Sequence, residues 1–164
     1  AIYLLDFIYR QLFMTYKVKS SHFVRLDTGI QLTFENPTKG WATNGGYVLV
    51  NVPFVSKAEW HAFSVFPHPA IPNHSCVCIA KSGDWTTALH NAVQRPTVRP
   101  AWIQGPFPTP FKTTEDYDHL VLVASGVGIT PAMASIHRFK DDQRQYHLIW
   151  ACRDASLIEF YAHS

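Results

Sequence analysis

Hydrophobic and polar residues alternate over short stretches in the first two thirds of the chain. The alternation is clean over residues 30–34 and looser over 17–26, which predicts strands that bury one face. Asn36-Pro37 and Asn44-Gly45-Gly46 are typical of turns, and Pro53 ends a further apolar run. We therefore expect strands at 17–26, 30–34, 47–52, 63–66, 75–81 and 101–103. So many short strands favour a small antiparallel β-barrel.

The pattern changes from residue 84 onward. Residues 84–94 have helical spacing, with Asp84 as the expected N-cap, and a proline-rich stretch follows. The apolar run 119–124 is typical of a buried parallel strand. A helix at 130–139 with Pro131 in its first turn, a strand at 146–151 and a helix at 155–162 are expected after it. This order predicts the first half of a doubly wound α/β lobe at 115–164, following a barrel domain at 15–114.

The first 14 residues predict a helix rich in apolar side chains, with Asp6 and Arg10 as its only charges. Two interpretations are equally open. The helix packs on its own domain, or it leaves a membrane span in a longer protein, of which a chain without an initial Met would be a piece. No run of about 18 apolar residues is present, so no segment of the sequence itself is expected to cross a membrane.

The composition is typical of a folded domain, and its nearly balanced charge does not favour binding to nucleic acid. Of 164 residues, 47% are hydrophobic, and 14 Lys and Arg stand against 12 Asp and Glu. Cys76 and Cys78 lie two apart on one expected strand, where a bridge between them would be strained, and Cys152 lies far away in sequence. The cysteines favour a reducing compartment, and no metal-binding spacing is found.

Gly126-Val127-Gly128 directly follows the apolar run and directly precedes a helix. Small residues at such a turn let a phosphate approach the backbone, and the amides at a helix N-terminus favour an anion. Arg153 is expected just past the next strand, where a guanidinium suits a ribose 2′-phosphate. The alternatives are glycines that only serve the turn and a surface arginine paired with Asp154.

A second constellation lies on the barrel. His61 and Phe63 share one face of an expected strand and Ser64 lies on the other. Together with Gly83 and Thr86 at a helix start, they offer the aromatic plane, polar groups and anion donors that a flavin nucleotide needs. The alternative is that Phe63 is a core aromatic and His61 a hydrogen-bonded histidine.

Five ordered motifs resemble the dehydrogenase domain of NADPH oxidases, within the ferredoxin-reductase-like and ferric-reductase superfamily. They are V-S-K-A-E-W-H-A-F-S at 55–64, G-D-W-T at 83–86, Q-G-P-F-P at 104–108, A-S-G-V-G-I-T-P at 124–131 and W-A-C-R-D at 150–154. The opening helix is similar to the family's link from the last membrane helix to the flavin barrel. Ala62 departs from the family's proline and Ala80 from its arginine or lysine, so weak FAD binding is expected.

The resemblance implies two sets of cofactor contacts and no catalytic side chain. Phe63 would lie against the isoalloxazine, with Ser64 near its reactive edge. The implied FAD contacts are His61, Ala62, Phe63, Ser64, Val65, Phe66, Pro67, Trp85 and Thr86. The implied NADPH contacts are Gly126, Val127, Gly128, Thr130, Pro131, Cys152 and Arg153.

The resemblance also implies a function. Electrons would pass from NADPH through FAD to hemes in the protein's own transmembrane domain and then to oxygen, with this segment on the cytosolic face and able to act with regulatory subunits or as an oligomer. Because the family's later part of the nucleotide lobe is absent, the segment alone is not expected to be fully active. The alternatives are the dehydrogenase domain of a ferric-chelate reductase and a cofactor-free barrel with a regulatory or interaction role.

Overall fold

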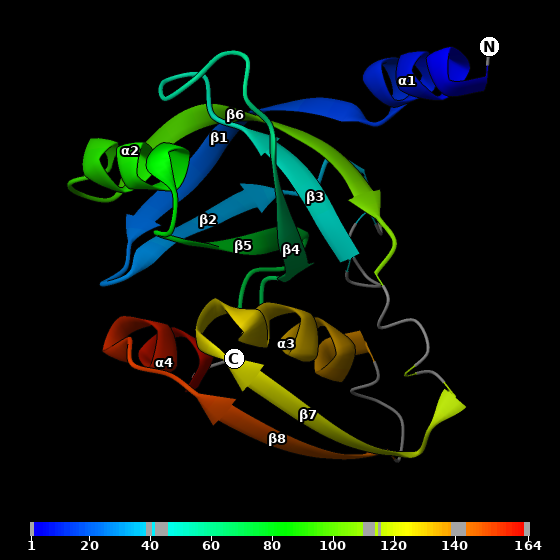
Figure 1. The fold of residues 1–164 in the computed structure, drawn as a ribbon, viewed down its shortest axis with the longest axis vertical. Coiled ribbons are helices and arrows are strands. Elements are labelled where there is room, and N and C mark those ends of the chain that lie inside the picture. The colour runs from blue at the N-terminus through cyan, green and yellow to red at the C-terminus, as the bar shows by residue number, and fades with distance from the viewer. Residues whose placement is uncertain are drawn as a thin grey trace.

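A computed structural model describes residues 2–38, 41, 46–109, 114, 116–138 and 144–162. Six antiparallel strands close into a barrel in the order β1-β2-β5-β4-β3-β6, and a smaller α/β lobe follows. Figure 1 shows the barrel above and the lobe below it, with α1 projecting at the N-terminus. The barrel strands are β1 (Thr15–Arg25), β2 (Gly29–Glu35), β3 (Gly46–Asn51), β4 (His61–Pro67), β5 (His74–Ala80) and β6 (Thr97–Phe107). The predicted barrel is thus confirmed.

Alternation along the strands fills the barrel. Ile30 and Leu32 of β2 pair with Ile79 and Val77 of β5, and all four side chains are buried in one apolar cluster. Outward positions of β4 and β5, including Phe66, Cys76 and Cys78, belong to a second apolar cluster shared with the lobe. The barrel therefore has an apolar interior and one apolar outer patch that carries the lobe.

Strand β6 is much longer than the predicted 101–103. It runs through Pro100 and Pro106, residues that suggested a loop because proline cannot donate to a sheet. The pairing of β1 with β6 shifts between Val18 and Ser21, opposite Pro100, and the pairing of β3 with β6 shifts opposite Pro106. These irregularities let the strand continue past each missing N–H group.

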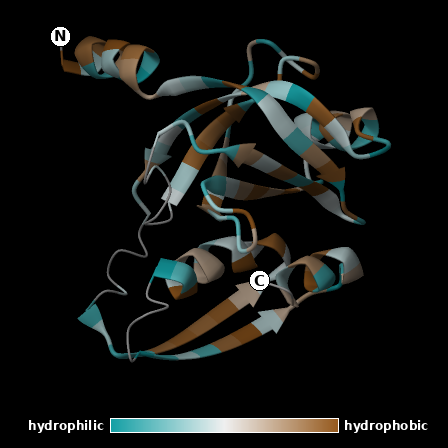
Figure 2. Ribbon diagram, turned by 180° about the vertical axis from the view of Figure 1, so that it is seen from behind, coloured by the Kyte–Doolittle hydropathy of each residue, from teal (hydrophilic) through white to brown (hydrophobic). Residues whose placement is uncertain are grey.

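The lobe contains two parallel strands, β7 (His119–Ser125) and β8 (Gln145–Ala151). Helices α3 (Ile129–Arg138) and α4 (Ala155–Ala162) lie between this sheet and the barrel. Figure 2 shows hydrophobic residues along β7 in the outer layer of the lobe. The expectation of a fully buried strand is wrong on this face, where Val121 is 65% and Val123 77% exposed. In the described part of the chain, helices cover only the inner face of the two strands.

The remaining helices also refine the predictions. α2 (Asp84–Ala92) begins one residue after its N-cap Gly83, so Asp84 is the first helical residue and not the cap. α3 starts at Ile129, one residue before the predicted start, with Pro131 in its first turn as predicted. Residue 139, the predicted end of that helix, lies outside the described residues, as do Asn44 and Gly45 of a predicted turn and residues 112, 113 and 115 of the boundary at 112–118.

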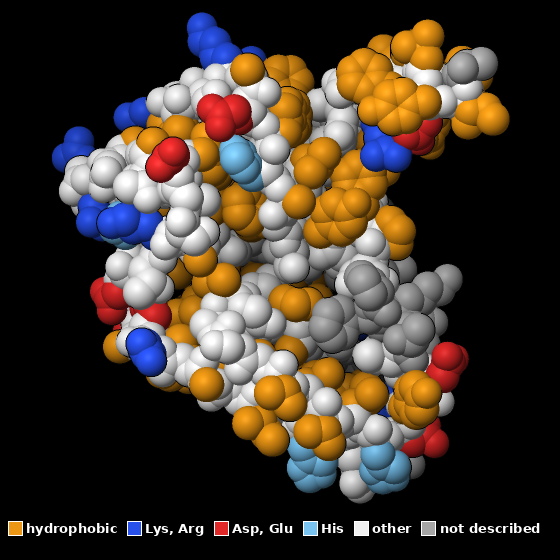
Figure 3. Space-filling view, viewed as in Figure 1, with side chains coloured by type: hydrophobic (Ala, Val, Ile, Leu, Met, Phe, Trp, Pro, Cys, Tyr) orange, Lys and Arg blue, Asp and Glu red, His pale blue; other side chains and the backbone are white. Residues whose placement is uncertain are grey.

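Helix α1 (Ile2–Phe13) has no buried residue. Ile2, Tyr3 and Leu12 are each at least 68% exposed, and Figure 3 shows apolar side chains over this helix. Of the two interpretations, packing on its own domain is therefore not what the structure shows. Within the described residues, no helix is long and apolar enough to cross a membrane.

Candidate functional site

The start of β4 and the start of α2 meet at the barrel surface. The ring of Trp85 lies 4.3 Å from the His61 ring and 6.1 Å from the Phe63 ring, and it is nearly parallel to the latter. Period-2 alternation puts His61 and Phe63 on one face of β4, and the turn after β5 brings Trp85 across to them. Two motifs about twenty residues apart in sequence thus form one aromatic cluster. Trp85 belongs to the apolar core of the barrel and Phe63 packs against that core, as the alternative of core aromatics expected.

Two nitrogens of this cluster lack hydrogen bonds. Nε1 of Trp85 and Nε2 of His61 are both buried and make none, although Nε2 lies 3.5 Å from a carboxylate oxygen of Glu59. A buried polar group without a partner costs about 1–3 kcal/mol. The His61 side chain as a whole is 36% exposed, whereas Trp85 is 6% exposed, so the cluster reaches the surface only on the side of His61.

The hydroxyl of Thr86 is already used within its own loop. It accepts hydrogen bonds from the Gly83 amide at 2.9 Å and the Ser82 amide at 3.0 Å, and it donates to the Gly83 carbonyl. Thr86 therefore orders the turn that begins α2. Its side chain contributes to a ligand site by shaping that turn and its first amides, which have no partner within the helix.

The other predicted contacts on β4 divide between the two faces of the strand. Val65 packs inside the barrel and Phe66 in the cluster shared with the lobe, and neither is exposed. Ala62 is exposed, whereas Ser64 and Pro67 are half-buried. The side chains available to a ligand are thus those at the start of the strand, and Val65 and Phe66 can offer it only backbone groups.

The glycine turn lies between β7 and α3, as predicted. It forms a short 3₁₀ segment, and Gly126 has a φ of +50°, a conformation that favours glycine. A Cβ on Gly126 or Gly128 would meet no other atom within 4 Å, so the backbone is open on that side. The carbonyl of Gly126 accepts a hydrogen bond of 2.9 Å from Nε1 of Trp150. Such a turn leaves room for a phosphate at a helix N-terminus.

Thr130 of the same motif points inward. It is 2% exposed, and its hydroxyl donates to the Val127 carbonyl at 2.9 Å. Pro131 occupies the first turn of α3 and is half-buried. The structure thus presents the glycines of the motif to the outside and holds its threonine hydroxyl inside.

A cavity of about 610 Å³ opens beside this turn. Its lining comprises Thr28, Ser125, Gly126, Trp150, Ala151, Cys152, Arg153 and Asp154. Cys152 and Arg153 were predicted for this place, whereas Thr28 was not. Thr28 comes from the turn between β1 and β2, and no local pattern relates it to a segment more than a hundred residues away.

Asp154 is held by the barrel and not by Arg153. Its carboxylate accepts hydrogen bonds from the Thr28 amide at 2.8 Å and the Thr28 hydroxyl at 2.5 Å, and it also binds the Ser156 hydroxyl and the Leu157 amide. Burial alone would raise the pKa of this group, but the hydrogen bonds from Ser156, Thr28 and Leu157 lower the pKa of Asp154 to about 2.

Arg153 is consequently available to an anion. It is exposed, and no salt bridge joins it to another residue in the part of the chain that the structure describes. The proposed pairing of Arg153 with Asp154 as a plain surface feature is therefore not what the structure contains. An unpaired guanidinium at the rim of the cavity suits a phosphate group.

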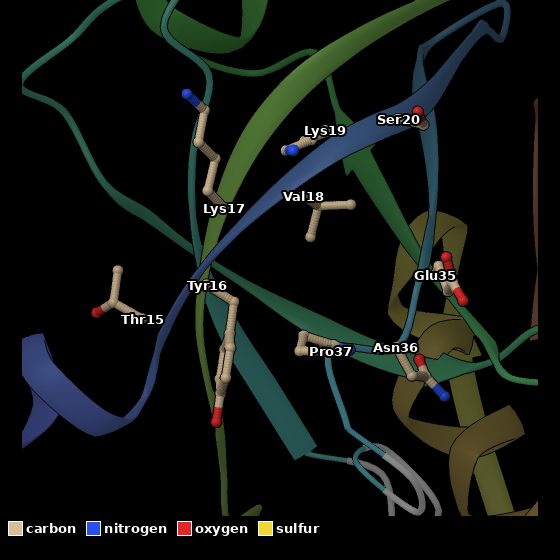
Figure 4. A pocket seen from close by; sticks show the side chains of 9 residues that line it. All are labelled: Thr15, Tyr16, Lys17, Val18, Lys19, Ser20, Glu35, Asn36 and Pro37. Carbon is tan, nitrogen blue, oxygen red and sulfur yellow. The ribbon is translucent and has the colours of Figure 1, made fainter.

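A second cavity, of about 600 Å³, lies along β1 and the end of β2. Figure 4 shows the strand alternation there, with Lys17 and Tyr16 pointing to opposite sides of β1. None of the predicted site residues lines it. Its nine lining residues are Thr15, Tyr16, Lys17, Val18, Lys19, Ser20, Glu35, Asn36 and Pro37.

Comparison with protein families gives a match to an FAD-binding domain model over residues 13–146. Among curated relatives, human NADPH oxidase 3 is 34% identical over 135 residues, covering 72% of this chain and 24% of the relative. Ferric reduction oxidase 8 of Arabidopsis thaliana is 32% identical over 124 residues, covering 65% of this chain and 16% of the relative. The chain spans about a quarter or less of the length of these relatives.

Solved structures show the same fold. A flavohemoglobin from Malassezia yamatoensis with bound FAD and heme aligns with a TM-score of 0.70 and 19% identity, over 99% of this chain and 47% of that one. A ferredoxin NADP⁺ reductase from Neisseria gonorrhoeae with bound FAD and NADP aligns with a TM-score of 0.61 and 15% identity, over 91% of this chain and 62% of that one.

Proposed function

Because the chain belongs to the FAD-binding domain family, we propose that it is the flavin-binding part of an NADPH oxidase-type oxidoreductase. Residues 1–14 would form a linker helix, 15–114 the FAD-binding barrel and 115–164 part of the NADPH-binding lobe. FAD, when bound, would supply the conversion of hydride transfer into single-electron transfer. The electrons would continue to hemes in a transmembrane domain and then to oxygen.

The observation that carries the proposal is the aromatic cluster of His61, Phe63 and Trp85, in which the indole N–H of Trp85 has no hydrogen-bond partner. The indole N–H is only a donor, so it requires an acceptor such as a phosphate or carbonyl oxygen of the flavin nucleotide. Phe63 would present its ring to the flavin plane, and the half-buried Ser64 would offer its hydroxyl. No residue of the barrel needs to act as a general acid or base in this scheme.

The lobe would hold the pyridine nucleotide through its backbone and one cation. Gly126 and Gly128 would let the pyrophosphate approach the start of α3, and Val127 lies between them. Arg153 would bind the 2′-phosphate that distinguishes NADPH from NADH. Cys152 lines the same cavity and would contact the adenosine side.

The exposed apolar surface of α1 supports a place next to a membrane. A helix with this much uncovered apolar area is unfavourable in water and favourable against lipid or a membrane domain. We propose that α1 follows a membrane span and places the barrel on the cytosolic face. The NADPH oxidase relatives support this arrangement by their similarity alone.

Titration with FAD, followed by flavin fluorescence, tests the barrel site. Trp85→Phe keeps an aromatic ring and removes the unpartnered N–H group, so FAD affinity should fall about fivefold, the effect of one hydrogen bond. Trp102→Phe is the matched control, because Trp102 lies on β6 beside Lys17, outside the cluster. Equal affinities of the two variants would contradict the proposed site.

The ferric reduction oxidase relative supports a second candidate, in which iron is the final acceptor. The two candidates share the donor, the flavin and the path, and they differ beyond this chain. Full-length protein in membranes would separate them. Superoxide formation with NADPH supports the oxidase, whereas reduction of a ferric chelate under anaerobic conditions without superoxide formation in air supports the reductase.

A further inference from the structure

Three buried side chains and one backbone carbonyl form a continuous series of hydrogen bonds between the barrel and the glycine turn. Sγ of Cys78 lies 3.5 Å from Oη of Tyr161, which lies 3.1 Å from Oγ1 of Thr130. Thr130 in turn donates to the Val127 carbonyl at 2.9 Å. Because Cys78 belongs to β5 and Tyr161 to α4, side chains from three separate elements meet at this point.

The donors in this chain have a fixed order. A hydroxyl has one proton, and Thr130 donates its proton to the Val127 carbonyl. Tyr161 must therefore donate to Thr130, and the Cys78 thiol must donate to Tyr161. Burial raises the pKa of Cys78 to about 11 and raises the pKa of Tyr161, so both groups keep their protons at neutral pH. The series of hydrogen bonds is thus intact in the folded protein at neutral pH.

Tyr161 also supports the neighbouring peptide. The edge of one ring meets the face of the other where Tyr161 packs against Trp150, with 5.8 Å between ring centroids. Trp150 donates to the Gly126 carbonyl. The backbone amide of Ile129 donates to the carbonyls of Gly126 and Val127 as well, so these two successive carbonyls of the turn point toward α3 and the two side chains that bind them. Because the C=O and N–H of a trans peptide point in opposite directions, the amides of Val127 and Gly128 point away from this network.

We propose that Tyr161 is a positioning residue for the nucleotide turn. It orients the peptides of Gly126 and Val127 so that the amides that follow them face the pyrophosphate of a pyridine nucleotide. This inference rests on the proposed function of the lobe. Since NADPH and NADH share the pyrophosphate, Tyr161 affects both nucleotides equally, in contrast to Arg153, which distinguishes them.

Tyr161→Phe tests the proposal, because it keeps the ring against Trp150 and deletes only the hydroxyl. Without ligand, amide hydrogen exchange of residues 127–132 should become about fivefold faster, the effect of one net hydrogen bond. In calorimetric titrations, the dissociation constants of NADPH and NADH should both rise by about the same factor. FAD affinity should stay unchanged. Tyr9→Phe is the matched control, since Tyr9 is 55% exposed on α1.

Variants of Thr130 test whether its hydroxyl connects Tyr161 to the glycine turn. Thr130→Val removes the hydroxyl and should accelerate exchange in the turn, whereas Thr130→Ser keeps it and should exchange more slowly than Thr130→Val. The double variant of Thr130→Val with Tyr161→Phe should add little to either single change, because both interrupt one chain. Additive effects would mean that the two hydroxyls act separately.

Two results would overturn the proposal. In the first, Tyr161→Phe lowers the free energy of unfolding but changes neither exchange in residues 127–132 nor either affinity, so that the hydroxyl is only structural. In the second, NADPH binding weakens and NADH binding does not. The affinities are measured on protein with a complete nucleotide lobe. Failure of that protein, without substitutions, to bind either nucleotide would contradict the proposed function and the nucleotide role of Tyr161, whereas the exchange result would still decide whether Tyr161 holds the turn.

Discussion

The carboxylate of Asp154 joins the lobe to the barrel, and its replacement by asparagine should measure that connection. Asp154 is 3% exposed and binds both the amide and the hydroxyl of Thr28. An asparagine side chain at this position would match the aspartate in size, but it carries no charge and has a single acceptor oxygen. The Thr28 amide or the cap of α4 at Leu157 would lose its partner.

The pKa of Asp154 gives the size of the effect. It lies at about 2, against an ordinary value of 3.8, and one unit corresponds to about 1.4 kcal/mol. The carboxylate lines an open cavity, where water screens part of this energy, so we expect Asp154→Asn to lower the free energy of unfolding by about 1–2 kcal/mol at pH 7. Because the folded pKa is depressed, this stabilisation is present above pH 4 and is lost as the pH falls toward 2.

Urea unfolding followed by tryptophan fluorescence, at pH 7 and at pH 3, measures the difference between the original chain and Asp154→Asn. The difference should shrink at the lower pH. Asp27→Asn is the control, because this neighbouring carboxylate lies on the same turn as Thr28 and is exposed. A difference that is the same at both pH values would refute the role of the charge, and an equal effect of Asp27→Asn would refute the role of the contact.

Three further predictions follow from the proposed sites. Phe63→Ala combined with Thr86→Ala should weaken FAD binding in a fluorescence titration, and Thr86→Ala should also lower stability by about 1 kcal/mol because the turn before α2 loses its acceptor. In protein with a complete nucleotide lobe, Arg153→Ala should weaken NADPH binding by about one to two decades and leave NADH binding unchanged in calorimetry, since one charge-assisted contact contributes about 1.5–3 kcal/mol. Deletion of residues 1–14 should make the protein more monodisperse in light scattering and leave its FAD affinity unchanged. If the shortened protein no longer unfolds cooperatively on heating, α1 is part of the barrel's folded core.

The sequence predicted the barrel well because apolar and polar residues alternate along several of its strands. Such alternation, as over residues 30–34 of β2, marks a strand without knowledge of its partners, although β2 and β5 are buried on both faces. It predicted β6 poorly, because Pro100 and Pro106 suggest a loop when read alone. Their place in a strand depends on bulges opposite them in β1 and β3, which only the paired structure reveals. The exposed face of β7 was missed for a similar reason, since an apolar run shows what a strand could bury and not what covers it.

The residues of the candidate sites also divide into those that local sequence predicts and those that only tertiary contacts reveal. His61, Phe63 and Trp85 could be predicted together, since a short strand and the next helix start bring them into one cluster. Thr28 and Tyr161 could not be, because each reaches the lobe cavity or the glycine turn only by tertiary contact. Thr130 could be predicted from its place in the motif at 124–131, yet its hydroxyl faces the interior of the protein.

Two kinds of contact hold the lobe against the barrel, and they have different effects. The apolar cluster around Phe66 and Ile129 stabilises the contact between lobe and barrel. It does not fix their relative orientation, because burial of apolar area is not directional. The hydrogen bonds that Asp154 accepts from Thr28 and that Tyr161 accepts from Cys78 are directional, and they attach opposite ends of α4 to two different barrel segments. Hydride transfer requires reacting atoms about 3–3.5 Å apart, so an orientation error of an ångström would be costly. These hydrogen bonds, with the one that Ser156 accepts from the Asp27 amide, are therefore the features of the described lobe best suited to set the position of the glycine turn relative to the barrel.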